Sequence, residues 1–411
     1  MKCRHCTTEL ALTFIDLGNS PPSNAYLPEA ALRAPEQYYP LRVLVCSQCW
    51  LAQTDDYADR DALFAPDYAY FSSYSSSWLA HAEAFVAAAV DRFGLDGKRC
   101  VVEVAANDGY LLQYVSARGI PCYGIEPTAG TATAARAKGL DIVEDFFGMA
   151  LADRLAREGR QADLLVANNV LAHVPDINDF VAGFTRLLKP QGVASFEFPH
   201  LLRLVEGKQF DTIYHEHYSY LSLHAARVVL AANGLEVFDV EELPTHGGSL
   251  RVWAQRRDSG EREETGRVST LLLAEERAGM LDGDFYRGFQ HEADNVKNEL
   301  LGFLLDAWRS GKTVAAYGAA AKGNTLLNYA GVRRDLLPFV VDRNPAKQGK
   351  FLPGSHIPVV SEDKLRESRP DYVLILPWNL RQEIASQLSY IAAWSGRVVV
   401  AVPRIEVWAA G

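Results

Sequence analysis

The sequence predicts an α/β protein with a small cysteine-containing N-terminal module and two larger domains in which strands alternate with helices. Three observations support this prediction. The chain has 411 residues, of which 48% are hydrophobic and 22% charged, and this composition can bury several cores. Two Cys-x-x-Cys pairs lie within residues 3–49. Short apolar runs bounded by Gly, Pro, Asn or Asp recur in two series with helical stretches between them, which is typical of parallel sheets covered on both faces.

Charge and apolar run length exclude several classes of partner. The chain carries 41 basic and 51 acidic residues, a formal charge of −10, so it has no general attraction for nucleic acids or anionic membranes. Its longest apolar runs, such as 85–90 and 398–402, are far shorter than the ~20 residues that cross a bilayer. The start, MKCRHC, lacks the apolar stretch of a signal peptide. We therefore expect a cytoplasmic protein.

The two cysteine pairs predict a structural zinc site. The four thiols belong to Cys3, Cys6, Cys46 and Cys49. Four thiolates can surround one Zn²⁺ tetrahedrally at about 2.3 Å and leave no position for water or substrate, so we expect the metal to stay remote from any reaction. Redox chemistry at one pair is the alternative. It requires a thioredoxin-like strand before the motif, for which Met1 and Lys2 leave no room.

The central segment is expected to begin with an apolar helix after residue 71 and to continue as a βα alternation. The expected strands are CVVEV (100–104), CYGIEP (122–127), Leu140 to Val143, DLLVANNV (163–170) and GVASFEF (192–198). A helix is expected from about Tyr110. Charged helical sequence from 261 to 309 then predicts a connector.

Polar residues at the ends of these strands predict an S-adenosylmethionine pocket. EVAANDG keeps only one glycine, which argues against a dinucleotide pyrophosphate cradle. An acid about twenty residues later suits a ribose diol, and an Asp-Phe pair suits an adenine. A lone acid after a strand is usually a solvated cap, but here several occur in register. The predicted cofactor residues are Glu103, Ala105, Asn107, Asp108, Gly109, Glu126, Pro127, Asp145, Phe146, Asn168 and Val170.

The stretch YHEHYSY, residues 214–220, suits methyl transfer to carbon. A carbon becomes nucleophilic only beside a carbonyl, and it then requires a base for its proton and donors for the enolate oxygen. His, Tyr and Glu are concentrated here, whereas an oxygen or nitrogen acceptor needs little such help. The sequence does not decide between an extended strand, a turn and a helix for this stretch. His-x-His also occurs in metal sites, which is a second reading.

Further candidates lie around this stretch. His173 follows a cofactor strand, and we assign it to the ketone oxygen or the sugar hydroxyls. His246 precedes two glycines that allow a tight backbone approach. Tyr68, Tyr70 and Tyr74 are candidate walls of the sugar pocket, although aromatic stripes more often pack in cores.

The last segment predicts a second α/β domain that binds a nucleotide. Its expected strands are TVAAYG (313–318), PFVVDRN (338–344), DYVLILPW (371–378) and GRVVVAVP (396–403). Small residues and a lysine after the first strand suit a diphosphate, an acid after the second suits a ribose, and an aromatic after the third suits a base. The alternative is a domain that has lost its ligand and acts as a lid. The candidates are Tyr317, Gly318, Lys322, Asn324, Asp342 and Trp378.

The combination of motifs resembles the nucleotide-sugar C-methyltransferases of antibiotic deoxysugar pathways. The motifs are CRHC, CSQC, EVAANDG, NNVLAHVPD, YHEHYSYLS, THGGSLRVW and AYGAAAKGNTLLN, and together they extend over essentially the whole chain. The resemblance implies methylation by S-adenosylmethionine at carbon 3, or less readily carbon 5, of a TDP-linked 4-keto-deoxyhexose. It places the base at His217, with Glu216 close by and Tyr214 on the substrate.

The sequence therefore predicts a Rossmann-like S-adenosylmethionine-dependent methyltransferase flanked by two other domains. The expected limits are a zinc-binding domain at 1–70, the methyltransferase at 71–257, a helical connector at 258–310 and a nucleotide-sugar-binding α/β domain at 311–411. An O- or N-methyltransferase is the rival enzyme, and a zinc module that only senses the cofactor is the rival without activity. We expect a TDP-ketosugar substrate and a monomer or weak dimer.

Overall fold

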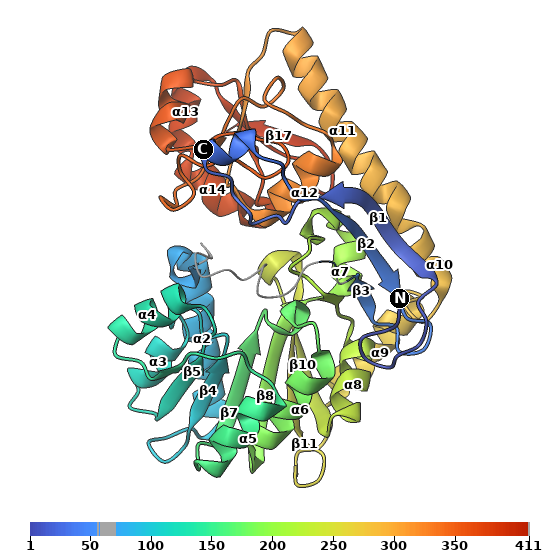
Figure 1. The fold of residues 1–411 in the computed structure, drawn as a ribbon, viewed down its shortest axis with the longest axis vertical. Helices are drawn as coiled ribbons and strands as arrows, with labels where there is room; N and C mark the ends of the chain where they lie inside the picture. Colours follow the sequence, from blue (N-terminus) through green and yellow to red (C-terminus); the bar gives the residue numbers. More distant parts are fainter. Residues whose placement is uncertain (56, 58–70, 410–411) are drawn as a thin grey trace.

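The computed structural model describes residues 1–55, 57 and 71–409, and Figure 1 shows a lower lobe, an upper lobe and a strand module beside both. The N-terminal module is a four-stranded antiparallel sheet in the order β1-β2-β3-β9. Its last strand comes from the central part of the chain. The elements are β1 (Leu12–Ser20), η1 (Glu29–Arg33), β2 (Tyr39–Val45), β3 (Ala52–Thr54) and β9 (Ser219–Tyr220).

The lower lobe is built on a seven-stranded sheet in the order β10-β11-β8-β7-β4-β5-β6. The strands are β4 (Val101–Val104), β5 (Cys122–Ile125), β6 (Ile142–Val143), β7 (Ala162–Asn168), β8 (Leu188–Pro199), β10 (Leu235–Leu243) and β11 (Ser249–Arg256). All five strands expected for this segment are present. The predicted Rossmann-like α/β class is therefore confirmed.

The five expected strands pair in parallel, but the complete sheet is mixed. Strand β11 runs antiparallel to both β8 and β10. The reason is the short connection η5 (Thr245–Gly247) between β10 and β11, because a tight turn can join only antiparallel strands. Sequence reasoning assigned neither of these strands.

Helices cover both faces of the central sheet (Figure 1). They are α2 (Ser76–Phe93), α3 (Leu112–Ser116), α4 (Ala129–Ala137), α5 (Met149–Arg157), α6 (Ile177–Leu187), α7 (Leu201–Glu206) and α8 (Leu223–Ala232), with the 3₁₀ turns η2 (Ser72–Tyr74), η3 (Leu171–His173) and η4 (Phe210–Thr212). The Ser75 side chain accepts from the Trp78 amide and begins α2, and left-handed Gly94 ends it. Helix α3 begins at Leu112, slightly later than expected.

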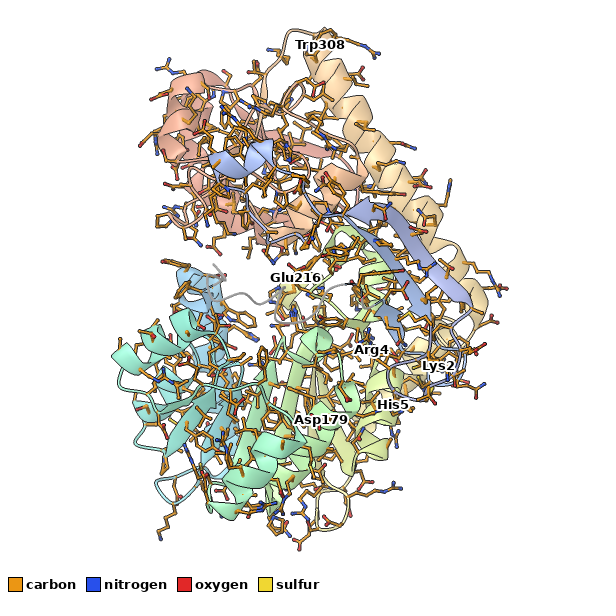
Figure 2. All side chains as sticks on the ribbon, viewed as in Figure 1. Lys2, Arg4, His5, Asp179, Glu216 and Trp308 are labelled. Atoms are coloured by element: carbon orange, nitrogen blue, oxygen red, sulfur yellow. The ribbon has the colours of Figure 1, made fainter. Side chains whose placement is uncertain are left out.

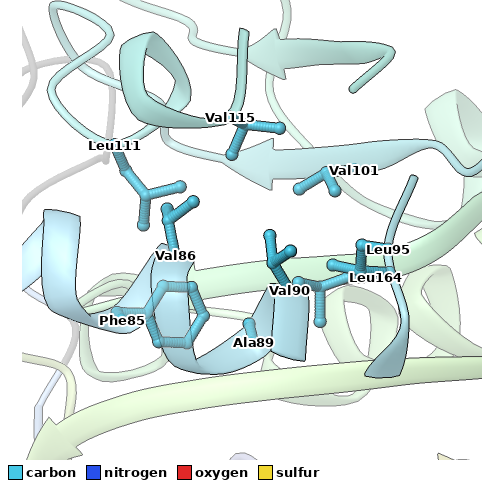
Figure 3. Close-up of a pocket in the computed structure, with 9 residues that line it drawn as sticks. All are labelled: Phe85, Val86, Ala89, Val90, Leu95, Val101, Leu111, Val115 and Leu164. Carbon is cyan, nitrogen blue, oxygen red and sulfur yellow. The ribbon is translucent and has the colours of Figure 1, made fainter. Parts of the chain in front are cut away.

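The face of α2 that points to the sheet is apolar. Phe85 and Val86 from this helix meet Leu111, Val115 and Leu164 around a small pocket (Figure 3). Since only apolar side chains line this pocket, it belongs to the core and not to a reactive site. Among the described residues, no helix has the length and apolar character that crossing a bilayer requires.

The connector is helical, as expected, and it packs against the N-terminal module. Its helices are α9 (Gly266–Arg277), α10 (Gly283–Arg287) and α11 (Phe289–Arg309). The Phe14 ring of β1 stacks on Phe289 at 4.6 Å between centroids and meets the edge of Tyr286 at 5.7 Å. Figure 1 shows α11 running from this contact toward the upper lobe. The connector therefore shares one core with the N-terminal module.

The upper lobe is a six-stranded sheet in the order β14-β13-β12-β15-β16-β17, of which only β17 runs antiparallel to its neighbour. Its elements are β12 (Val314–Tyr317), α12 (Ala321–Tyr329), β13 (Val340–Val341), β14 (Val359–Val360), α13 (Glu362–Ser368), β15 (Tyr372–Ile375), η6 (Trp378–Leu380), α14 (Arg381–Gln387), η7 (Ser389–Trp394), β16 (Arg397–Val400) and β17 (Glu406–Ala409). The second α/β domain predicted from the sequence is confirmed.

Candidate functional site

The central crevice lies at the carboxyl ends of β4, β5 and β7, formed by residues 105–109, 126–127 and 168–170. The backbone after β4 is strained, because Ala105 and Asn107 have φ values of 54° and 50°. A left-handed conformation costs a non-glycine residue roughly 1–2 kcal/mol, and such strain gathers at ligand sites. Gly109 has φ 77°, and a Cβ there would lie 2.3 Å from the Leu140 side chain. The single glycine of EVAANDG is therefore required by packing.

Buried polar groups in the central crevice lack partners. Asn168 is 7% exposed, and within the residues described here neither atom of its side-chain amide has a hydrogen-bond partner. Asp108 is 4% exposed, with Lys138 Nζ 3.5 Å from one carboxylate oxygen and no described donor at the other. Burial raises the pKa of Glu103 well above its ordinary value. Because buried polar groups are normally paired, this set fits a polar ligand.

Glu126 organises the loops of the central crevice. One carboxylate oxygen accepts from the Asn107 amide and the other from the Thr128 amide, both at 2.9 Å. Burial raises the pKa of Glu126, and these amide hydrogen bonds oppose the shift. Each oxygen keeps a second lone pair, so the carboxylate is still able to accept from the predicted ribose. Pro127 is half-buried beside it.

The Asp-Phe pair is placed differently from a buried adenine site. The Asp145 side chain is 50% exposed and lies 3.1 Å from Arg154. Phe146 is half-buried, whereas Phe147 packs edge-on against Phe180 in the core. Val170 is 9% exposed at the end of the crevice. Contact of Asp145 and Phe146 with a cofactor stays a prediction.

Tyr214 to His217 form a turn, which we call the reactive turn. The His217 amide donates to the Tyr214 carbonyl at 2.9 Å, so the stretch is neither a strand nor a helix. Its side chains point in separate directions. His215 contacts the Pro40 carbonyl at 3.3 Å, and one Glu216 oxygen accepts from the Asn24 amide and side chain at 3.3 and 3.1 Å. The His-x-His pair is therefore divided, which disfavours the metal reading.

The turn brings His217 against His173, with 4.6 Å between ring centroids. Nδ1 of His217 lies 2.8 Å from the Thr212 carbonyl, and Nδ1 of His173 lies 2.8 Å from the Glu216 carbonyl. A carbonyl only accepts, so both Nδ1 atoms carry hydrogen and both Nε2 atoms carry a lone pair. Burial lowers the pKa of His217 well below its usual value and that of His173 to about 4. Both rings are therefore neutral near pH 7.

Glu216 does not reach the His217 ring, whose Nδ1 is fixed by a backbone carbonyl. Burial raises the pKa of Glu216, and its second oxygen has no partner among the described residues. The Tyr214 ring lies against His217, with 4.0 Å between centroids. The arrangement joins one neutral base, one phenol and one buried carboxyl in a small volume.

The four predicted zinc ligands come together at the base of the N-terminal module. All four Sγ atoms lie within 4.8 Å of one another, with 3.6 Å between those of Cys3 and Cys49 and 3.4 Å between those of Cys6 and Cys46. The edge of a tetrahedron with 2.3 Å arms is about 3.8 Å, so the cluster fits one Zn²⁺. Burial of three of the thiols agrees with a structural site.

Comparisons with known proteins match this architecture along the whole chain. Residues 3–64 match a zinc binding domain, residues 78–240 a methyltransferase domain and residues 244–403 a C-methyltransferase C-terminal domain. The C-methyltransferase NovU of Streptomyces niveus is 32% identical over 406 residues, which are 99% of this chain and 96% of that protein. The chain belongs to the C-methyltransferase family. It is an S-adenosylmethionine-dependent enzyme with a four-cysteine module consistent with zinc.

Solved structures with a similar fold cover less than half of this C-methyltransferase in the two examples that follow. The magnesium protoporphyrin IX methyltransferase of Synechocystis PCC 6803 with bound SAM has 17% identity and a TM-score of 0.34, over 43% of this chain and 79% of that chain. An S-adenosylmethionine-dependent methyltransferase of Clostridium acetobutylicum ATCC 824 has 10% identity and a TM-score of 0.34, over 42% and 90%. Matches at these scores carry no argument about the substrate.

The upper lobe of the C-methyltransferase directs Lys322 toward the reactive turn. Lys322 Nζ donates to Asn379 Oδ1 at 2.7 Å and lies 4.5 Å from the centre of the Trp378 ring. Trp378 Nε1 donates to Asp211 at 2.7 Å, and burial raises the pKa of that carboxyl to about 6. The positive charge of Lys322 also contributes to the lowered pKa of His217. Trp378 is thus engaged with Asp211 and Lys322, and its contact with a base stays a prediction.

The C-terminal crevice, residues 318–320 and 342–347, is partly filled by the chain itself. Asp342 accepts from the amides of Ala319 and Asn344, both at 2.8 Å, with Lys347 Nζ 3.8 Å away. Tyr26, from the N-terminal module, donates to the Ala319 carbonyl at 2.5 Å, and Lys347 Nζ donates to the same carbonyl at 2.7 Å. The predicted ribose acid therefore already has partners within the protein.

The other predicted nucleotide residues lie at contacts inside the chain. Asn324 donates to the Ser23 carbonyl at 2.6 Å and so faces the N-terminal module. Gly318 has φ 87°, and a Cβ there would lie 2.5 Å from Pro377. The Tyr317 side chain is 4% exposed in the core of the upper lobe. Nucleotide contact by these three residues stays a prediction.

His246 lies next to the loop that follows β7, and its contact with the substrate stays a prediction. Its Nε2 is 3.4 Å from the Asn169 side chain, and its ring is 5.2 Å from Trp78 between centroids. Burial lowers the pKa of His246 to about 4. Tyr74 is 68% exposed and does not wall a pocket in this structure. Tyr68 and Tyr70 lie outside the described residues.

Sequence reasoning missed a buried ion-pair network next to this site. Glu197 at the end of β8 is fully buried and lies 2.9 Å from His81 and 2.8 Å from Arg251. Thr245 Oγ1 donates to the same carboxylate at 3.2 Å. These contacts hold the Glu197 pKa below its usual value despite burial. Pairing of β8 with β7 places Glu197 opposite Asn168. Pairing of β8 with β11 places Arg251 opposite Glu197, and because β11 was not assigned from the sequence, this ion pair was missed.

Proposed function

We propose that this C-methyltransferase methylates the carbon next to the ketone of a TDP-linked 4-keto-deoxyhexose, at C3 in preference to C5. The observation that carries the proposal is the pair of neutral imidazoles, His173 and His217, at the mouth of the central crevice. An alcohol oxygen or an amine nitrogen already carries a lone pair for the methyl group, whereas a sugar carbon beside a ketone becomes a nucleophile only after a base removes its proton.

His217 is the base in this proposal. Its Nδ1 hydrogen is held by the Thr212 carbonyl, so the Nε2 lone pair takes the proton from the sugar carbon. The lowered pKa of His217 keeps the ring unprotonated, and therefore competent as a base, at neutral pH. When bound, S-adenosylmethionine supplies the electrophilic methyl group. Asn168, Asp108 and Glu126 are the residues that would hold it in the central crevice.

The remaining groups divide between donors and acceptors. The Tyr214 phenol, packed against His217, is a donor suited to the developing enolate oxygen. Nδ1 of His173 donates to the Glu216 carbonyl, so Nε2 of His173 is an acceptor. An acceptor suits a sugar hydroxyl better than a ketone oxygen. Lys322 faces the same space from the upper lobe and suits the diphosphate of the nucleotide.

Hydrogen exchange at the sugar tests the proposal. The enzyme is incubated with the ketosugar nucleotide in heavy water without methyl donor, and the sugar is examined by mass spectrometry and NMR. Deuterium is expected at the carbon that is methylated in the complete reaction, and His217→Asn is expected to abolish the exchange. Methyl transfer to oxygen or nitrogen without any deuterium at carbon would refute the proposal.

A further inference from the structure

The N-terminal module contacts the reactive turn through its third strand. Strand β3 pairs with β9, directly after the turn, with Ala52 opposite Tyr220. The Thr54 amide donates to the Tyr218 carbonyl at 3.2 Å, and Thr54 Oγ1 donates to the His217 carbonyl at 3.0 Å. Thr54 is 2% exposed. The strand that follows the second cysteine pair therefore holds the backbone of the proposed base.

Gln53 ties this strand to the cysteine cluster. Its side chain is fully buried, and Nε2 lies 3.3 Å from Cys3 Sγ. Its Oε1 accepts from the Arg4 amide at 2.8 Å. One amide side chain thus joins the first cysteine pair to β3. A hydrogen bond to a thiolate is stronger than one to a thiol, so metal binding strengthens this link.

Arg4 spans both segments that carry the imidazoles. One guanidinium nitrogen donates to the Thr54 carbonyl at 2.8 Å and another to the Pro175 carbonyl at 2.8 Å. Pro175 follows His173 by two residues, and the guanidinium lies 5.3 Å from the centre of the Tyr218 ring. Figure 2 labels Arg4 between the N-terminal strands and the lower lobe. Arg4 therefore links the ends of the two histidine-bearing segments.

We propose that Arg4, Gln53 and Thr54 are positioning residues, through which the zinc module fixes His217 against His173. The inference rests on the proposed function of His217. The Nδ1 of His217 is anchored on Thr212, so the aim of Nε2 depends on where the His217 backbone lies, and Thr54 holds that backbone. Misplacement of a reacting group by about 1 Å can cost about 10²-fold in rate. In this inference the metal site affects the reaction through the position of His217. The sequence had instead suggested a metal remote from the reaction.

Thr54→Val tests the bond without changing the shape of the strand. We expect kcat and donor-free deuterium exchange to fall together by about 10-fold, with KM for the sugar nucleotide and the zinc content unchanged. Thr54→Ser keeps the hydroxyl and is expected to retain wild-type rates. Thr185→Val is the matched control, because the Thr185 hydroxyl donates to the Asn233 carbonyl at 2.6 Å and contacts neither the cysteines nor the turn. Wild-type kcat and exchange in Thr54→Val would overturn the inference.

A second measurement does not depend on the substrate. Zinc is withdrawn from the wild-type enzyme with a chelator, and amide hydrogen exchange is followed by mass spectrometry. Peptides covering 213–220 are expected to lose protection, whereas peptides covering β16 keep it. Unchanged protection of 213–220 after metal loss would also overturn the inference. If wild-type enzyme deuterates no ketosugar, the proposed function fails, while this exchange result still decides whether the module braces the turn.

Discussion

The central and C-terminal crevices hold an acid in the same way but differ in what surrounds it. Glu126 accepts from the first loop of its sheet and from the amide two residues later, and Asp342 repeats both contacts. Around Glu126, buried polar atoms such as those of Asn168 have no partner among the described residues. Around Asp342, Lys347 and Tyr26 already occupy the space. The same backbone motif therefore lies beside unpartnered polar atoms of Asn168 in one lobe and beside side chains that fill the space in the other.

The largest expected effect comes from replacing each of the two acids, Glu126 and Asp342, by its amide in separate variants. Glu126→Gln places a side-chain amide beside a backbone amide donor. We expect it to weaken binding of S-adenosylmethionine by about 10- to 100-fold, because a hydrogen bond to a charged group contributes about 1.5–3 kcal/mol. Asp342→Asn removes the equivalent charge and is expected to leave this affinity unchanged. Isothermal titration calorimetry measures both. Equal losses in the two variants would mean that the crevices are not distinct in function.

The pH dependence is the second test, since the C-terminal crevice contains no histidine. In the proposed mechanism the two imidazoles work in their neutral form, and burial lowers the pKa of His173 to about 4. We expect kcat/KM to stay level between pH 8 and 6 and to decline only as the pH approaches about 4. An acid limb near the ordinary histidine pKa of about 6.5 would show that the rings are not buried as described.

The same shift has a consequence for stability. The folded-state pKa of His173 lies below its ordinary value of 6.5, so the unfolded chain binds more protons than the folded chain as the pH falls. The free energy of unfolding should therefore decrease from pH 6.5 toward pH 4. Chemical denaturation at several pH values measures this trend. His173→Gln is the control variant and should make the trend less steep, while His217 and His246, whose pKa values burial also lowers, maintain the rest of it.

A smaller effect is expected when the C-terminal crevice is opened. Tyr26→Phe removes the hydrogen bond to the Ala319 carbonyl and should lower the free energy of unfolding by about 1 kcal/mol. Binding of S-adenosylmethionine should not change. Denaturant titration and calorimetry give the two values. A loss of cofactor affinity would show that Tyr26 acts on the central crevice as well.

The smallest effect concerns Asp145, the exposed acid of the predicted adenine site. Its side chain is half-exposed and paired with Arg154. An interaction at such an exposed charge contributes at most about 1 kcal/mol, so Asp145→Asn should change cofactor affinity by at most about five-fold. Arg154→Gln is the matched control, with no expected change. A loss as large as that of Glu126→Gln would place the adenine on this carboxylate.

Local sequence signals predicted the parallel strands and the cysteine cluster, because both depend on short-range patterns. They did not reveal β11, since its role follows from the turn η5 and from pairing with β8, far away in sequence. The shape of the reactive turn also escaped, because a stretch rich in His and Tyr has no periodicity. Contact between Asn324 and Ser23 was equally hidden, since a helix start after a strand suggests a ligand unless the facing module is known.

Residue identities in the site were easier to predict than their directions. His173 and His217 meet, but the fixed tautomers come from carbonyls of Glu216 and Thr212 that no side-chain pattern encodes. Tertiary placement decides which nitrogen carries the lone pair. The domain limits proposed from the sequence are simple cuts in the chain, whereas β9 belongs by sequence to the central segment and by pairing to the N-terminal sheet.

The strand β9 also constrains how the chain is made. Residues 219–220 complete the sheet that begins at Leu12, and Phe289 covers the ring of Phe14. A ribosome must therefore synthesise most of the lower lobe before the first sheet is complete, and more than half of the protein before the Phe14 ring is covered. Contacts of such sequence separation form slowly. The earliest part to emerge during translation is then among the last to reach its final packing, which exposes it to chaperones and proteases meanwhile.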